Sequence, residues 1–119
     1  HLSDANLTRA NLTGADLSDA NLTRANLTRA DLSDANLRGA DLTGADLTGA
    51  NLTNTDGSRT FFLGANLTGV DLSNANLYDA KLRDANLKRA NLEGAHLTGA
   101  DLTNANLRAA TMPDGTIHD

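Results

Sequence analysis

Residues 20–53 read ANLTRANLTRADLSDANLRGADLTGADLTGANLT, one short phrase repeated without interruption. A leucine stands at every fifth position, an alanine stands two residues before it, and Asn or Asp stands between them. The leucine spacing runs from Leu2 to Leu52 and again from Leu67 to Leu107; the central positions that depart from it are Gly57, Phe62, Met112 and Ile117. A five-residue unit therefore fills nearly the whole chain.

This spacing fits neither a helix nor a flat strand. On an α-helix it would advance successive leucines by about 140°, and on a strand it would place them on opposite faces. The chain must therefore turn within every repeat. The residue two after each leucine falls at the corner, where Gly and Asn tolerate the positive φ of a type II turn. The charged residues Arg9, Arg24 and Asp34 at this position predict a second type of turn.

Short inward-facing pairs joined by equal corners close into coils, and neighbouring coils can bond backbone to backbone, as in a solenoid. We therefore predict that each leucine and the alanine two before it are buried. The positions one before, one after and two after each leucine are predicted to be exposed.

The repeated unit A-[ND]-L-[ST]-x, as in residues 5–9 and 100–104, resembles the pentapeptide-repeat family. The resemblance implies an all-β fold, a right-handed quadrilateral β-helix with four pentads in each coil. Residues 1–119 would then form a single domain of about six coils. The implied core ladder comprises Leu7, Leu27, Leu47, Leu67 and Leu87, with Phe62 stacked in a neighbouring column.

Residues 53–65, TNTDGSRTFFLGA, interrupt the repeat motif but preserve its five-residue spacing. In one interpretation they remain coiled, Phe62 stacks between Leu42 and Leu82, and a neighbour fills the space at Gly57. In the other, residues 55–61 bulge out as a loop led by the Asp56-Gly57 turn. The stretch could also be a seam between two arrays, because the C-terminal MPDGTIHD has a similar Asp-Gly pair. Looping out two pentads would rotate every later face by two corners.

Charge is distributed unevenly if the coil is continuous. The face through Leu7 and Leu27 holds five basic residues against one aspartate, Asp46. We predict that these basic residues form an interaction face: Arg9, Arg29, Lys88, Arg89 and Arg108. The next face carries only acidic residues, which are Asp31, Asp34, Asp71, Glu93 and Asp114.

Candidate chemistry is sparse. The chain contains no cysteine, which removes disulfides, thiolate ligands and a cysteine nucleophile. Its histidines, His1, His96 and His118, are too far apart in sequence to suggest a metal site. Several Asn-x-Ser/Thr matches arise from the repeat itself, so we do not read them as glycosylation sites. We expect no enzyme activity, no cofactor and no metal.

The leading functional interpretation is a structural or protein-interaction solenoid that binds an unidentified protein. The alternative is a DNA-mimicking inhibitor of a type II topoisomerase, as some members of the resembled family are. The formal net charge of −5 has the right sign for a DNA mimic, but a basic face imitates a polyanion poorly. Ice binding is a third possibility, because Thr8, Thr28, Thr48 and Thr68 would stack in one column.

The longest strongly apolar run, residues 61–63, is far shorter than the roughly 20 residues of a membrane helix. We therefore expect a soluble chain that contacts neither a membrane nor nucleic acid directly. A monomer or an end-to-end dimer would suit the rod. No targeting leader is visible before the first repeat, so the compartment stays open, with the cytoplasm as the expectation.

Overall fold

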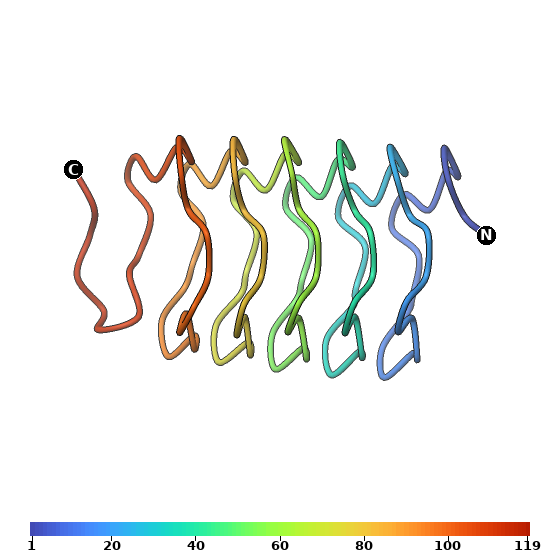
Figure 1. Cartoon of the computed structure of the whole chain (residues 1–119), viewed down its shortest axis with the longest axis horizontal. Coiled ribbons are helices and arrows are strands. Elements are labelled where there is room, and N and C mark those ends of the chain that lie inside the picture. The colour runs from blue at the N-terminus through green and yellow to red at the C-terminus, as the bar shows by residue number, and fades with distance from the viewer.

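From Asn6 to Asn91, the residue that precedes each central position pairs with its equivalent twenty residues later. Asn6 bridges Asn26, which bridges Asp46, and the bridges are parallel. Four pentads therefore make one coil. The computed structural model describes residues 1–119, and its principal extents are 36 × 24 × 21 Å. In Figure 1 the coils stack along the long axis, with the two termini at opposite ends.

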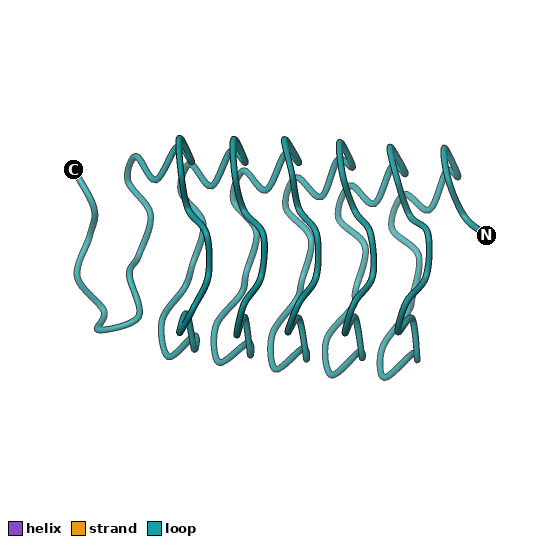
Figure 2. Ribbon diagram, viewed as in Figure 1, coloured by secondary structure: helices purple, strands orange, loops and turns teal.

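The chain contains no α-helix and no continuous β-strand, so Figure 2 draws it as loop throughout. Adjacent coils are joined instead by single bridges with paired backbone hydrogen bonds. Leu27 N donates to Asp46 O at 2.7 Å, and Asp46 N donates to Ala25 O at 3.0 Å. A corner follows each bridge immediately, which prevents a longer strand from forming. The result is a β-helix solenoid held by backbone bonds between its coils.

One kind of turn closes the corners of the coil. Ala30 N donates to Leu27 O at 2.9 Å, and the residue between them at the corner, Arg29, has a φ of 58°. A positive φ at the third residue of a hydrogen-bonded turn is the signature of type II. Arg24 and Asp34 adopt φ values of 57° and 61°, close to those of the corner glycines.

The predicted second turn type is therefore wrong. Arg9, at 60°, shares the left-handed backbone of the glycines as well. Backbone bonds from the preceding and following coils fix the corner geometry. They outweigh the penalty of roughly 1–2 kcal/mol for a non-glycine residue in this region.

The Asn or Asp before each leucine ties the following turn together. Asp31 Oδ1 accepts hydrogen bonds from Ser33 N at 3.0 Å and from Ser33 Oγ at 2.7 Å. Asn21 Oδ1 accepts the same two bonds from Thr23, at 3.1 and 2.8 Å. Such bonds satisfy a turn donor that the coil leaves free. They explain why the repeat usually places Asn or Asp before leucine and Ser or Thr after it.

A continuous core of leucines and alanines runs along the axis. The centres and the residues two before them are buried from Leu22 to Leu92, as predicted. Leu7 of the core ladder is only partly buried, because the N-terminal coil, residues 1–20, lacks a neighbour on one side. The residue before the leucine, such as Asp46, is half-buried in most middle coils rather than exposed. Its equivalents in the preceding and following coils flank it.

Residues 53–65 continue the coil, so the looped-out interpretation is wrong. Asp56 bridges the residues twenty before and twenty after it, and Phe61 bridges Asp41 and Lys81. Phe62 is fully buried at the centre position, in the column of Leu42 and Leu82. The basic faces of the two halves therefore keep their alignment.

Larger neighbours fill the space at Gly57. A Cβ on Gly57 would lie 2.9 Å from Leu77 Cδ2. In the same coil, buried threonines replace two of the inward alanines. Thr55 Oγ1 donates to Leu52 O at 2.9 Å, and Thr60 Oγ1 donates to Leu37 O at 2.7 Å. Every buried polar side-chain atom has a hydrogen-bond partner, so the irregular pentads are accommodated without a polar defect.

The chain leaves the coil after Pro113, whose carbonyl still accepts a hydrogen bond from Gly94 N at 3.0 Å. Thr111 forms an antiparallel bridge with Ile117, and Met112 N donates to Thr116 O at 2.7 Å. The prediction that Ile117 is an inward centre is wrong, because its side chain is 63% exposed. Pro113, Asp114 and the following glycine build a tight reversal: Pro sets φ at the second turn position, and Gly accepts a positive φ.

This C-terminal hairpin corrects a further expectation. The Asp114-Gly115 pair reverses the chain, with a φ of 85° at Gly115, whereas Asp56-Gly57 stays within the coil. The resemblance between the two Asp-Gly pairs therefore does not mark two equivalent array ends.

Candidate interaction faces

The predicted basic face lies along one side of the solenoid, and its residues form two groups. Arg9 and Arg29 occupy the same corner of adjacent coils, because Arg9 N donates to Thr28 O at 2.9 Å. Both side chains are exposed. The next two corners of this column are Gly49 and Gly69. These glycines leave the middle of the face without a corner side chain.

The second group lies towards the C-terminus. Arg89 N donates to Arg108 O at 3.0 Å, which places these residues in adjacent coils. Lys88 is half-buried, whereas Arg89 and Arg108 are exposed. Arg29 and Arg89 are three coils apart, or roughly 14 Å along the axis at a spacing of about 4.8 Å. The structure thus brings all five residues to one face but does not join the two groups.

The aspartate on this face forms no ion pair with the arginines. Asp46 Oδ1 accepts hydrogen bonds from Thr48 N at 3.0 Å and Thr48 Oγ1 at 2.6 Å. Its carboxylate is thus engaged in its own turn. The structure contains one ion pair, between Arg24 and Asp4, and it lies on another face.

Only the basic face stacks like charges in adjacent coils. Arg9 precedes Arg29 in the corner column, and Lys88 precedes Arg108 in the column that follows the leucines. Cations held one coil apart repel one another. No other face of the coil places two residues of the same charge at equivalent positions in adjacent coils. The basic face therefore carries an electrostatic repulsion that the rest of the surface avoids.

Carboxylates never occupy equivalent positions in adjacent coils. On the acidic face, the column before the leucines alternates between amide and acid: Asn11, Asp31, Asn51, Asp71 and Asn91. The next face continues the pattern with Asp16, Asn36, Asp56 and Asn76. Asn and Asp offer the same Oδ1 acceptor to the turn. Alternation therefore keeps the turn bonds and avoids repulsion between carboxylates about 4.8 Å apart.

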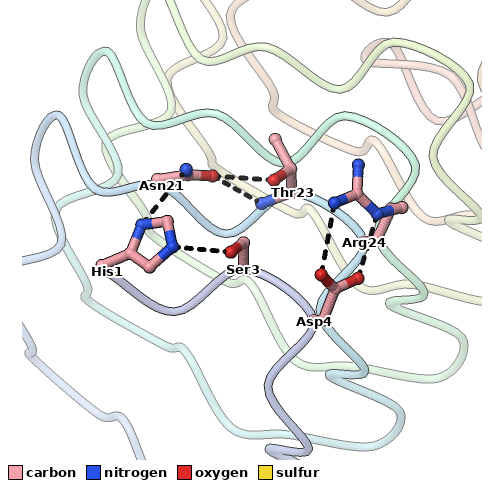
Figure 3. A network of polar contacts seen from close by, with 6 residues as sticks. All are labelled: His1, Ser3, Asp4, Asn21, Thr23 and Arg24. Carbon is pink, nitrogen blue, oxygen red and sulfur yellow. Dashed lines mark hydrogen bonds and ion pairs between the residues drawn. The ribbon is translucent and has the colours of Figure 1, made fainter.

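A polar network joins the N-terminal coil to the next (Figure 3). Arg24 Nε donates to Asp4 Oδ1 at 2.9 Å. This hydrogen bond is the main reason that the pKa of Asp4 is lowered and that of Arg24 is raised. His1 lies 2.8 Å from Ser3 Oγ and 3.4 Å from Asn21 Nδ2 through its two ring nitrogens. Asp4 and Arg24 are exposed, so their ion pair contributes little to stability.

The interrupted stretch exposes apolar side chains at outward positions. Phe61 is 40% exposed, and Leu63 lies outward two residues later, where it is half-buried. Other pentads usually hold Asn or Asp, and Ser or Thr, at these two positions. This surface was not predicted from the sequence, although the spacing of the repeat already assigns both residues to the outside.

A second exposed aromatic side chain lies on the neighbouring face. Tyr78 is 40% exposed, and its ring packs edge-on against His96 with centroids 6.4 Å apart. The two residues come from adjacent coils. His96 Nε2 lies 2.8 Å from Thr98 Oγ1, so the imidazole takes part in a turn contact.

The surface shows no pocket, and no three His, Asp or Glu side chains lie close enough together to hold a metal ion. None of the chain forms a helix with the length and apolar character that crossing a bilayer requires. The candidate sites are therefore surface faces rather than a cavity.

Comparisons with known proteins agree with the repeat and the coiled fold described above. The family model described as pentapeptide repeats matches in eight copies, over residues 1–39, 35–74 and 75–112. No curated protein matches the chain. Among solved structures, Rfr23, a pentapeptide repeat protein from the cyanobacterium Cyanothece 51142, is 40% identical with a TM-score of 0.68. The alignment covers 84% of this chain and 65% of Rfr23.

Two more distant structures share the fold. A pentapeptide repeat protein from the Arabidopsis thaliana thylakoid lumen is 28% identical with a TM-score of 0.64, over 92% of this chain and 69% of that one. Trypsin-treated QnrB1, a plasmid-mediated fluoroquinolone resistance protein, is 21% identical with a TM-score of 0.56. That alignment covers 92% of this chain and 70% of QnrB1. At this identity the likeness concerns the fold alone.

Proposed function

Because the chain belongs to the pentapeptide-repeat family, we propose that it is a non-catalytic scaffold that binds a protein partner through its basic face. The stacked cations of that face carry the proposal. Arg9 repels Arg29, and Lys88 repels Arg108, whereas the other faces avoid such pairs. An anionic partner that contacts both members of a pair relieves their repulsion, and complementary charge also directs the encounter.

The proposal assumes the fold that the family implies, a right-handed quadrilateral β-helix of about six coils. The register of twenty residues between bridged positions supports four sides per coil. On such a rod the basic face adjoins the acidic face that contains Asp31, Asp34, Asp71 and Glu93. The partner therefore meets positive and negative charge side by side, which sets its orientation.

The partner surface must present acidic groups to two cationic clusters about 14 Å apart. Because the cations are exposed or half-buried, the contact should be sensitive to salt. Charges on the surface are screened beyond roughly 8 Å at physiological ionic strength. We expect affinity to fall steeply as salt increases.

The alternative function is inhibition of a type II topoisomerase by imitation of DNA. The net charge of −5 and the acidic face favour it, whereas the basic face opposes it. A gyrase supercoiling assay with the intact chain separates the two proposals. Inhibition that survives reversal of the basic face but is lost on reversal of Asp34 and Asp71 would favour the DNA mimic.

The scaffold proposal is tested by reversing charge without disturbing the coil. A partner is first identified by crosslinking, and its affinity is then measured for the purified chain. Arg29→Glu/Lys88→Glu/Arg89→Glu should weaken binding by about tenfold or more, a loss of about 1.4 kcal/mol. The melting temperature should stay nearly unchanged. The matched control is Arg38→Glu/Arg59→Glu on another face, which should retain affinity; equal losses in both variants would contradict the proposal.

A further inference from the structure

The interrupted stretch places two apolar side chains beside two cations on one face of the solenoid. Phe61 and Leu63 lie on either side of an inward centre and therefore point outward together. Lys81 and Arg83 hold the equivalent positions one coil later. Phe61 bridges Lys81, and Gly64 N donates to Arg83 O at 3.0 Å. The four side chains form a two-by-two array.

The coil itself does not require this array. The column of Phe61 otherwise holds polar residues: Asn21, Asp41, Lys81 and Asp101. The same is true of the column of Leu63, which holds Ser3, Thr23, Thr43, Arg83 and Thr103. Apolar residues at these outward positions leave Phe61 40% exposed to water.

The array also replaces two stabilising turn contacts. In the preceding coil, Asp41 Oδ1 accepts a hydrogen bond from Thr43 N at 3.0 Å. Phe61 and Lys81 have no side-chain oxygen, so the turns at Leu63 and Arg83 lack this bond. Two consecutive pentads of one face thus forgo the contact that the repeat otherwise uses to close its turns. A surface that gives up local stability to expose apolar groups is suited to binding.

The cations of the array are not paired within the chain. The one ion pair in the structure lies elsewhere, between Arg24 and Asp4. The pKa of Asp101 is lowered chiefly by the hydrogen bond that the Thr103 hydroxyl donates. Arg83 and Lys81 add smaller electrostatic contributions to that shift. Their charges therefore remain available to a partner.

We propose that Phe61, Leu63, Lys81 and Arg83 form a second contact surface, separate from the basic face, that binds an acidic protein segment carrying apolar side chains. The apolar side chain covers Phe61 and Leu63 and removes them from water. A neighbouring carboxylate meets Lys81 and Arg83, where an arginine beside an aromatic is typical of interface hot spots. A two-fold contact that stacks the apolar pairs of two copies would also place these cations against each other, which disfavours a second copy as the occupant.

The probe is a fluorescein-labelled peptide in which Glu alternates with Leu and Phe, titrated with the intact chain and followed by fluorescence anisotropy. A peptide with Lys in place of Glu is the matched control. Phe61→Asn/Leu63→Thr introduces residues that the repeat uses elsewhere, so it should fold with an unchanged or higher melting temperature. We expect the acidic peptide to bind and the basic peptide not to bind. The double substitution, or Lys81→Glu/Arg83→Glu, should weaken binding about tenfold.

Four results would overturn the proposal. The first is no binding of the acidic peptide, or equal binding of both peptides. The second is an unchanged affinity for the acidic peptide in the Phe61→Asn/Leu63→Thr variant. An affinity that falls only in the basic-face variant, Arg29→Glu/Lys88→Glu/Arg89→Glu, would count in the same way. The third is a dimer in sedimentation velocity that the Phe61/Leu63 substitution dissociates, which would assign the surface to a second copy. The fourth is a lower melting temperature for that variant, which would give the apolar pair a role in the coil.

Discussion

Leu77 fills the space where Gly57 lacks a side chain: a Cβ added to Gly57 would lie only 2.9 Å from Leu77 Cδ2. The two residues are equivalent centres of adjacent coils, since Gly57 N donates to Asn76 O at 2.7 Å. The space left by the missing leucine side chain in one coil is thus filled by the leucine side chain of the next coil. Protein interiors tolerate few voids, so the pair should be energetically coupled.

A double-mutant cycle tests this coupling. Gly57→Ala should lower the free energy of unfolding by about 1–3 kcal/mol, because the new methyl overpacks the core. Leu77→Ala should lower it by about 2–5 kcal/mol, because it leaves a cavity. In the double variant the new methyl enters the space that Leu77 vacates. The combined loss should therefore be smaller than the sum by about 1 kcal/mol or more.

Urea unfolding followed by circular dichroism measures each free energy of unfolding. Leu107→Ala in the half-buried C-terminal layer is the control and should destabilise less than Leu77→Ala. Strict additivity of the Gly57 and Leu77 substitutions would show that the contact does not couple them.

Unfolding should spread inward from both ends of the rod. Leu7 and Leu107 lie in terminal layers that are only partly buried, whereas Leu47 and Leu67 are fully buried between neighbours. In a solenoid each coil is stabilised mainly by the coils beside it. Amide hydrogen exchange should therefore be slowest in the middle coils. Slowest exchange within residues 1–10 or 108–119 would refute this order.

The repeat predicts the register of this fold because a fixed period leaves little freedom. Phe62 could be placed in the core, and Arg29 on the face of Arg89, by counting alone. The corner conformation could not be predicted in this way. Arg9 and Asp34 disfavour a positive φ as single residues, but bonds to neighbouring coils impose it. Such cooperation between coils is not visible in local propensity.

The C-terminal reversal and the outward apolar pair were missed for a different reason. Extending the period past Met112 made Ile117 a core residue, although Pro113 and Gly115 form a local turn signal. The period predicts burial of Phe62 at the central position, but it does not distinguish apolar from polar residues at the outward positions of Phe61 and Leu63. A departure from a repeat at an outward position indicates a contact surface more directly than one in the core.

Acid should weaken the coil by removing charge from turn carboxylates. Ser33 lowers the pKa of Asp31, first through its hydroxyl and then through its backbone N–H, and Ser18 does the same for Asp16. A lowered folded pKa stabilises the fold above the unfolded value of about 3.9, and this stabilisation is lost as pH falls through the folded pKa. Asp31→Asn keeps the Oδ1 acceptor without the charge. It should therefore reduce the loss of melting temperature below pH ~4.

The matched control for the acid experiment is Asp34→Asn, which removes an exposed corner carboxylate that holds no turn bond. Thermal melts across the acidic range should show little change in its pH dependence. If both substitutions reduce the loss of melting temperature at acidic pH equally, general charge repulsion explains that loss and the turn bonds do not.

The alternation of Asn and Asp should be a requirement of the fold rather than an accident of sequence. Asn51 bridges Asp31 and Asp71, so Asn51→Asp would place three carboxylates in consecutive coils. Their repulsion opposes the lowering of pKa that the bond from Thr53 N gives a carboxylate at this position, so the folded pKa of the new carboxyl group should be higher than that of an equivalent aspartate flanked by amides. The variant should therefore lose stability, relative to such an aspartate, as pH rises through the folded pKa.

Asn86→Asp makes the same chemical change between two amides, Asn66 and Asn106, and serves as the control. Thermal melts at neutral pH and low salt should give a lower melting temperature for Asn51→Asp than for Asn86→Asp. The difference should shrink at about 1 M salt, where the screening length is only about 3 Å. Equal melting temperatures in the two variants, or a difference that salt does not reduce, would show that stacked carboxylates are tolerated. The absence of stacked acids would then carry no electrostatic meaning, and the stacked cations of the basic face would lose their main support as a binding signal.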